Sequence, residues 1–227
     1  MSGAKRVVAA LILVAVLWQG WYFGWVLWWK WFNPDMTSFM SLRVDELREK
    51  NPKAQLKHQW VPYAKISANL KRAVVAAEDD KFIDHEGFDW EGIQKALKKN
   101  QRRGHVVAGG STISQQLAKN LLLSASKTPW RKAQEAVITI MIEVLWDKRR
   151  ILEVYLNSVE WGEGVFGAEA AAQRYFSTTA AALGAAQAAR LAVMLPAPRR
   201  FEKNPYSSYL NAHTQLILGR MQYSEVP

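Results

Sequence analysis

Two carboxylates stand where a run of small and apolar residues ends, and together they could serve proton transfer. Glu78 and Asp79 directly follow Ala76 and Ala77, in a segment whose apolar residues recur with helical spacing. The dipole at a helix C-terminus disfavours negative charge, and neighbouring carboxylates repel each other. Both effects raise the pKa of a carboxyl group, which suits a general base. The alternative is an acidic turn that faces water, the usual place of a charge cluster.

A second segment is rich in side chains that could bind a sugar or a phosphate. Gly109 and Gly110 predict a turn, and the residues after them predict a capped helix whose first N–H groups are free to meet an anion. An ordinary capped helix explains the cap but not the density of amide groups. The polar side chains of this segment are Ser111, Thr112, Gln115, Gln116, Lys119 and Asn120.

A third segment gathers cations around the start of another predicted helix. Lys127, Arg131 and Lys132 could bind a diphosphate group. Arg131 and Glu135 are i, i+4 neighbours, so a weak ion pair on a helix surface is the alternative. Ser124 and Lys127 also fit the Ser-x-x-Lys pattern of penicillin-binding transpeptidases. The later motifs of that chemistry are absent, so we interpret this fit as a chance match.

The elements that must position these groups are predicted to be helices almost throughout, because strand patterns are few and short. The basic segment from Gln101 to Gly110 ends in glycines and is predicted to be mobile. The predicted helices run from Val44 to Lys50, Ser67 to Asp79, Asp89 to Arg102, Thr112 to Leu122, Thr128 to Trp146, Lys148 to Asn157, Val165 to Tyr175, Thr179 to Leu195, where Pro196 and Pro198 end it, and Tyr206 to Met221.

The N-terminus carries a run without charge, from Val7 to Trp29, which is long enough to span a bilayer. Tryptophans crowd its second half, as is typical of a membrane interface, and Lys5 and Arg6 precede it. The positive-inside rule therefore predicts a cytoplasmic N-terminus, although Lys30 weakens the asymmetry. A cleaved signal peptide is the alternative, but its apolar region would be shorter and end in small residues. The predicted divisions are a cytoplasmic tail (1–6), a transmembrane helix (7–29), a juxtamembrane connector (30–57) and an extracytoplasmic domain (58–227).

Composition narrows the classes of function. The 227 residues, 49% of them apolar, are enough for a sizeable core. Cysteine is absent, so neither a disulfide framework nor a thiolate metal site is possible. The formal net charge of +10 favours anionic lipids, phosphorylated substrates or nucleic acid. The predicted membrane segment makes the first two partners the better interpretation.

Two motifs together resemble a known family. The run from Glu78 to Gly87 reads Glu-Asp-x-x-Phe-x-x-His-x-Gly, and that from Gly109 to Gln116 reads Gly-Gly-Ser-Thr-Ile-Ser-Gln-Gln. With three weaker segments further along, they resemble glycosyltransferases that polymerise lipid II, above all the monofunctional biosynthetic peptidoglycan transglycosylases of Gram-negative bacteria. The resemblance covers the N-terminal apolar segment and residues 61–205. It implies a mainly α, lysozyme-like domain with two lobes, behind one transmembrane helix in the bacterial inner membrane, with the catalytic domain in the periplasm.

The resemblance also implies roles for individual residues. Glu78 matches the general base, which deprotonates the 4-hydroxyl of the acceptor sugar so that undecaprenyl diphosphate leaves the donor. Glu135 matches a second carboxylate that orients cations near the diphosphate. No cofactor is implied as required, although Mg²⁺ or Mn²⁺ could assist at the diphosphate, and no dedicated metal ligands are evident. The implied substrate-binding residues are Asp79, Phe82, His85, Gly110, Ser111, Thr112, Gln115, Gln116, Lys119, Asn120, Lys127, Arg131 and Lys132.

Three other functions remain open at this point. A lysozyme-like hydrolase would cleave the same polymer, usually with two carboxylates across the bond. A catalytically silent module could bind cell-wall glycan or recruit proteins of cell-wall synthesis or of the divisome. Nucleic-acid binding rests on charge alone, and the outward orientation counts against it. The expected partners of the transferase are lipid II, the growing lipid-linked glycan and the membrane.

Overall fold

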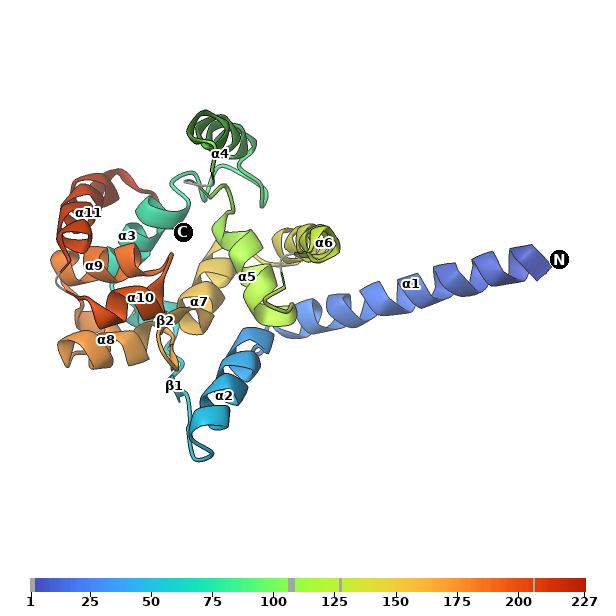
Figure 1. The fold of residues 1–227 in the computed structure, drawn as a ribbon, viewed down its shortest axis with the longest axis horizontal. Helices are drawn as coiled ribbons and strands as arrows, with labels where there is room; N and C mark the ends of the chain where they lie inside the picture. The colour runs from blue at the N-terminus through green and yellow to red at the C-terminus, as the bar shows by residue number, and fades with distance from the viewer. Residues whose placement is uncertain (1–2, 106–108, 127, 206) are drawn as a thin grey trace.

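The computed structural model describes residues 3–105, 109–126, 128–205 and 207–227. Most of its regular structure is helical, and a long N-terminal helix projects from a body of shorter helices (Figure 1). The prediction of a mainly α domain behind an apolar N-terminal helix is therefore confirmed.

The projecting helix, α1 (Gly3–Trp28), is long enough to cross a bilayer. Its 26 residues extend about 39 Å at about 1.5 Å per residue. Among the residues that the structure describes, α1 is the one helix with the length and apolar composition of a membrane span. Its N-terminal part is exposed, whereas Val26 near its end is fully buried. The last turns of α1 therefore pack against the body of the domain.

Apart from α4, the helices that follow α1 fall into two groups. In the group next to α1, helix α5 packs against each of its neighbours. In the second group, α3, α9 and α11 all contact one another. The first group consists of α2 (Ser38–Lys50), α5 (Ile113–Leu122), α6 (Pro129–Leu145) and α7 (Lys148–Ser158). The second consists of α3 (Ala68–Glu78), α8 (Ala168–Phe176), α9 (Ala185–Met194), α10 (Pro198–Lys203) and α11 (Ser208–Arg220).

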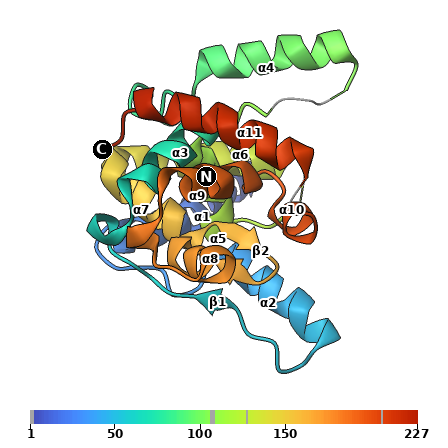
Figure 2. The same ribbon diagram turned by 90° about the vertical axis from the view of Figure 1, so that its left-hand side faces the viewer.

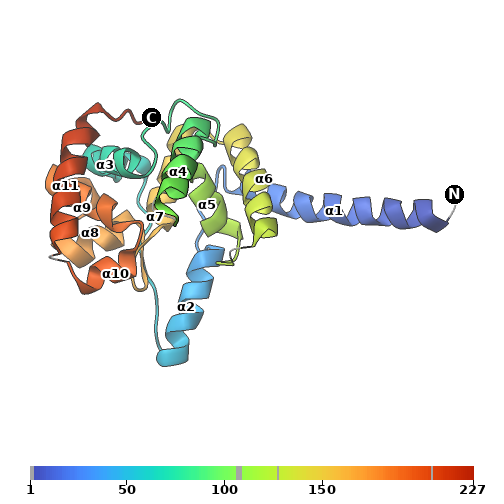
Figure 3. The ribbon, with the colours of Figure 1, turned by 45° about the horizontal axis from the view of Figure 1, so that its top comes forward.

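Helix α4 (Trp90–Arg103) stands at one edge of the molecule in Figures 1 and 2, and in Figure 3, where that edge comes forward, it lies in front of the other helices. A small sheet joins segments that are distant in the sequence, with the strand order β1-β3-β2. Strand β3 (Val165–Phe166) runs parallel to β1 (Lys57–His58) and antiparallel to β2 (Glu160–Gly162). The sheet thus ties the connector before α3 to the segment between α7 and α8.

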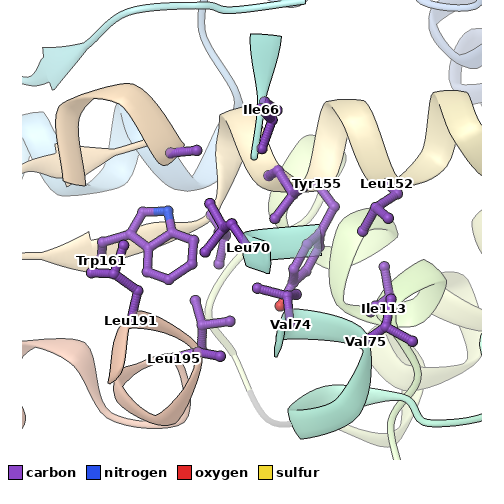
Figure 4. Packing of buried hydrophobic residues seen from close by; sticks show 14 of the residues in the cluster. Ile66, Leu70, Val74, Val75, Ile113, Leu152, Tyr155, Trp161, Leu191 and Leu195 are labelled. Atoms are coloured by element: carbon purple, nitrogen blue, oxygen red, sulfur yellow. The ribbon is translucent and has the colours of Figure 1, made fainter. Parts of the chain in front are cut away.

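One hydrophobic core runs through both groups of helices (Figure 4). Tyr155 of α7 reaches toward Val74 of α3, and Trp161 lies beside Leu191 of α9. Neither Tyr155 nor Trp161 has any exposed surface. Because large buried side chains make many close contacts, this packing holds α3 in a fixed position relative to α7 and α9.

Polar caps begin five helices where the sequence predicts them. In each case the side-chain oxygen accepts a hydrogen bond from a backbone N–H two or three residues later, which satisfies one of the unpaired donors of the first turn. The helices that follow, α3 to α7, end within one residue of their predicted ends. The five capping residues are Ser67, Asp89, Thr112, Thr128 and Asp147.

Two predicted helices begin later than expected. In the one predicted from Val165, the first two residues form strand β3, and α8 begins at Ala168 after Gly167. The φ angle of Gly167 is +82°, a conformation that favours glycine and interrupts a helix. In the one predicted from Thr179, a short 3₁₀ turn comes first and α9 begins at Ala185. The residue before it, Gly184, is extended and donates its N–H to Oε1 of Gln187 at 3.0 Å.

Other boundaries also differ from the prediction. The connector helix, predicted from Val44, begins at Ser38, because Oγ1 of Thr37 accepts a hydrogen bond from the N–H of Met40 at 3.1 Å. Helix α10 was not predicted. Its Pro198 was expected only to end a helix, but proline is also favoured at a first helical position, where no N–H is needed.

Three predictions fall on residues outside the described ones. Lys127 and Tyr206 are among them, as are residues 106–108 of the segment predicted to be mobile. Helix α11 begins at Ser208, and Oγ of Ser207 accepts a hydrogen bond from the N–H of Leu210.

Candidate active site

Glu78 is the last residue of α3 and points its carboxylate at α5. Its Oε2 accepts a hydrogen bond from Nε2 of Gln116 at 2.7 Å. The hydroxyl of Tyr155 donates to Oε1 of the same amide at 3.0 Å. Since that bond leaves the amide nitrogen free to donate, Tyr155 fixes Gln116 in the orientation that holds Glu78.

The surroundings of Glu78 raise its pKa, as the sequence predicts. The largest cause is burial, which penalises the charged form, and the nearby carboxylate of Asp79 adds to it. The hydrogen bond from Gln116 and the charge of Lys119 act in the opposite direction. Burial thus has a larger effect than the carboxylate crowding that the sequence suggested. A carboxyl group with a raised pKa suits proton abstraction near neutral pH.

Asp79 has a different environment from its neighbour. It is buried, and its Oδ2 accepts a hydrogen bond from the N–H of Ile113 at 2.9 Å. Its Oδ1 lies 2.9 Å from Nε2 of His85, whose Nδ1 accepts a hydrogen bond from the N–H of Gly87. That second bond assigns the proton to Nε2, so His85 donates to Asp79. Asp79 therefore holds the turn after α3 to the start of α5, whereas Glu78 lines a neighbouring cavity.

Glu78 also lines a small cavity of about 140 Å³ between α3, α4 and α5. Gly110, Ser111 and Thr112 line the opposite wall. Gly110 allows close approach, because a Cβ atom there would lie 3.1 Å from the Cα of Ile93 in α4. The cavity places the carboxylate of Glu78 beside the polar residues that precede α5.

A network of buried polar side chains, which the sequence did not reveal, also holds the turn between α3 and α4. Oε1 of Glu143 accepts hydrogen bonds from Oγ of Ser114 at 2.5 Å and from Nζ of Lys148 at 2.9 Å. Lys148 also donates to the carbonyl oxygen of His85 at 2.5 Å. The only sign of this network in the sequence is Glu143, a charged residue within the apolar stretch of α6. Ser114, Glu143 and Lys148 thus connect α5, α6 and α7 beneath the turn.

The cations predicted to bind a diphosphate gather around Glu135 of α6. Its side chain is 4% exposed, and Oε2 accepts a hydrogen bond from Nη1 of Arg131 at 2.5 Å. Oε1 pairs with Nζ of Lys132, which also donates to Oγ of Ser111 at 3.2 Å. Nε of Arg131 is buried and has no hydrogen-bond partner among the described residues. Glu135 is therefore buried and the side chain of Arg131 is only 15% exposed, in place of the exposed helix-surface pair that the sequence allowed.

Lys119 of α5 lies within electrostatic reach of both this group and Glu78. Burial lowers its pKa, the charges of Arg131 and Lys132 lower it further, and Glu135 and Glu78 oppose the change. The charges of both carboxylates therefore act on the pKa of Lys119. We call Lys119, Arg131 and Lys132, with their carboxylate Glu135, the cation cluster.

The predicted substrate-binding residues divide into two sets by exposure. Buried ones have structural roles: Phe82 has no exposed surface, and the Thr112 hydroxyl donates to the carbonyl oxygen of Gly87 at 2.7 Å while the residue forms a capping box with Gln115. Asp79 and Asn120 are also buried, and His85 nearly so. The residues that keep some exposed surface are Gly110, Ser111, Gln116, Lys119, Arg131 and Lys132.

No metal centre is evident in the part of the chain that the structure describes, since it contains no group of three His, Asp or Glu side chains placed to hold an ion. The possible Mg²⁺ or Mn²⁺ at a diphosphate stays a prediction.

A family model described as transglycosylase matches residues 45–222 of the chain. The chain belongs to the transglycosylase family. The resemblance seen in the sequence is thereby confirmed, and with it the assignment as a glycosyltransferase.

Similar proteins cover this transglycosylase along its whole length. A biosynthetic peptidoglycan transglycosylase of Aromatoleum aromaticum is 64% identical over 227 residues, which are 100% of this chain and 98% of that protein. Proteins of the same name from an Azoarcus species and from Dechloromonas aromatica are 64% and 60% identical, over 98% of this chain and 96% of each relative. The transglycosylase is therefore similar to these enzymes in its N-terminal helix as well as in its domain.

Proposed function

We propose that this transglycosylase polymerises lipid II into β-1,4-linked glycan strands. The observation that carries the proposal is the pairing of two features across α5. One is a carboxylate with a raised pKa, Glu78, held by Gln116. The other is the cation cluster, in which a buried carboxylate holds two cations at the start of α6.

The reaction balances with these groups alone. Glu78 takes the proton of the acceptor's 4-hydroxyl group, and that oxygen bonds to C1 of the donor sugar. The bond between C1 and the diphosphate oxygen breaks, and undecaprenyl diphosphate leaves with its electrons, so that C1 inverts. Cations near the departing diphosphate stabilise the charge that develops on it.

Hydrolysis of finished glycan is the second candidate, and the state of Glu135 argues against it. A hydrolase usually has a second carboxylate beside the bond to be cleaved. Glu135 is buried and engaged by Arg131 and Lys132, so it serves the cations instead. The possible transpeptidase serine, Ser124, is exposed and hydrogen-bonds only to Ser126 among the described contacts. We therefore propose a monofunctional transferase that β-lactams do not label.

We also propose that α1 anchors the enzyme in the inner membrane, with the N-terminus in the cytoplasm and the domain in the periplasm. Its length and its exposed apolar surface support a span, and Lys5 and Arg6 support the orientation. The last turns of α1 pack on the domain, which argues against removal of α1 as a signal peptide. Both substrates are lipid-linked, so confinement to the same membrane raises their effective concentration.

One experiment distinguishes the candidates. The full-length enzyme in detergent-free vesicles is given labelled lipid II in one reaction and finished, uncross-linked glycan in another. The proposal predicts long glycan from lipid II and no fragments from finished glycan. Fragments from finished glycan without polymer would favour the hydrolase, and neither product would favour a binding module.

A further inference from the structure

The N-terminal helix carries a single amide within its apolar run, and this amide is paired with the catalytic domain. Nε2 of Gln19 donates to Oε1 of Gln134 at 2.9 Å, and Nε2 of Gln134 donates to Oε1 of Gln19 at 3.0 Å. Gln134 belongs to α6 and is buried. An amide in apolar surroundings costs free energy unless its donors and acceptor are paired. The reciprocal pair therefore favours one rotation and one depth of α1 against α6.

Two further contacts hold the end of α1 in the same place. Nε1 of Trp146, the residue after α6, donates to the carbonyl oxygen of Val26 at 2.8 Å. Arg150 of α7 donates to the carbonyl oxygens of Trp29 at 2.8 Å and Phe32 at 2.7 Å. These carbonyls lie at or just beyond the helix end, where backbone acceptors lack partners within the helix. A flexible tether would need none of these bonds.

Helix α6, on which α1 packs, carries most of the cation cluster. Gln134 is next to Glu135 in α6, and Arg131 lies one turn earlier. Helix α6 packs on α5 as well as on α1. The position of α6 sets how near Arg131 and Lys132 lie to Lys119 and to Ser111.

We propose that Gln19 is a positioning residue for the cation cluster. Through Gln134 it holds α6 in register with α5, so that the membrane helix shapes the leaving-group site as well as keeping the enzyme at the membrane. The role in catalysis rests on the proposed function, whereas the docked arrangement itself does not.

The activity test uses the full chain in vesicles of lipid II. Gln19→Leu leaves the amide of Gln134 unpaired while α1 becomes more apolar, so membrane retention stays intact. The expected result is a roughly tenfold lower kcat, equivalent to about 1.4 kcal/mol, with KM little changed. Gln134→Leu should behave alike. In the double variant two leucines can pack together, so the losses should not multiply. A wild-type kcat in Gln19→Leu, or losses that multiply in the double variant, would overturn the proposal.

A cross-linking test needs no activity. The chain contains no cysteine, so Gln19→Cys with Gln134→Cys gives two unique thiols. A short reagent that joins two thiols should link them within the membrane, and the linked enzyme should keep its activity. The matched control is Leu17→Cys with Gln134→Cys, since the Leu17 side chain is 65% exposed and should not link. Failure to link, or an inactive linked enzyme beside an active wild type, contradicts the proposal. Linking in an enzyme whose wild type makes no polymer refutes only the proposed function.

Discussion

At the scale of single residues, two adjacent carboxylates have different environments because their partners differ. Asp79 accepts hydrogen bonds from a backbone N–H and from His85 and is buried in the turn. Glu78 has one amide donor, and burial raises its pKa. Neighbouring groups whose environments differ in this way commonly divide acid–base and structural roles. We therefore propose that Glu78 abstracts the proton and that Asp79 supports the turn.

The first prediction concerns the dependence of activity on pH. A general base must be ionised, so kcat/KM should fall as the pH is lowered through the raised pKa of Glu78. Gln116→Leu removes a hydrogen bond that lowers this pKa, so the acidic limb of the profile should move to higher pH. Gln222→Leu, at an exposed position, is the matched control and should leave the limb unchanged. A limb that stays in place, or moves to lower pH, in Gln116→Leu would count against Glu78 as the base.

The second prediction concerns Glu135. Glu135→Gln leaves Arg131 and Lys132 without their carboxylate, and breaking a buried ion pair from one side costs about 3 kcal/mol of folding free energy. Urea unfolding should show this loss, together with a lower kcat. The control is Glu91→Gln, which breaks the exposed pair with Lys81 and should not change stability measurably. Equal stability of the two variants would show that Glu135 is not the buried partner of these cations.

At the scale of elements, the turn between α3 and α4 is the part on which the site depends. Asp79 and Gly87 connect it to the start of α5 by accepting hydrogen bonds from the N–H of Ile113 and the hydroxyl of Thr112. Lys148 connects it to α7. Gly87 has a φ angle of +91°, and a Cβ atom there would lie 2.8 Å from Cγ2 of Thr139. This position therefore tolerates little besides glycine.

The third prediction tests that turn. Gly87→Ala should lower the free energy of unfolding by about 2 kcal/mol or more, since it adds both a strained φ and a clash. Gly104→Ala is the matched control: its φ is +69°, but nothing lies within 4 Å of the added atom. The free energy of unfolding of Gly104→Ala should fall by only about 1 kcal/mol. Losses of the same size, measured by urea unfolding, would show that the close packing beneath Gly87 contributes nothing.

Local features made much of the fold predictable from the sequence. Thr112 and Asp147 cap their helices through bonds to residues nearby in the chain, so their signals lie within a few residues. The break at Gly167 was missed because it depends on a strand partner at His58, far away in the sequence. Glu78 and the cation cluster were found through motifs. Glu143 was missed because its partners on α5 and α7 come together only in the fold.

At the scale of the whole molecule, the N-terminal helix and the domain form one packed unit. Val26 and Trp29 are buried against the domain, whereas the first part of α1 is exposed. The chain is thus an enzyme whose N-terminal helix, which we propose spans the membrane, ends inside its own core. The juxtamembrane segment, predicted as a connector, likewise contains α2, which packs on α5.

The fourth prediction follows from that packing. A variant that lacks residues 1–32 loses the buried contacts of Val26, worth about 2 kcal/mol alone, and should have a lower Tm in detergent. A variant that lacks only residues 3–14, which are exposed, should keep the Tm of the full chain. Equal Tm values for all three proteins would show that α1 is not docked on the domain.

The central claim is that Glu78 is the base of a lipid II polymerase, and Glu78→Gln tests it most directly. Glutamine keeps the size of the side chain and an acceptor for Gln116 but cannot take a proton. Polymerisation of labelled lipid II should be measured for the wild type and the variant, together with binding of the same substrate. We predict long glycan from the wild type. For the variant we predict unchanged binding and a rate lowered by at least about a thousandfold. A variant that polymerises at a rate close to that of the wild type would contradict it.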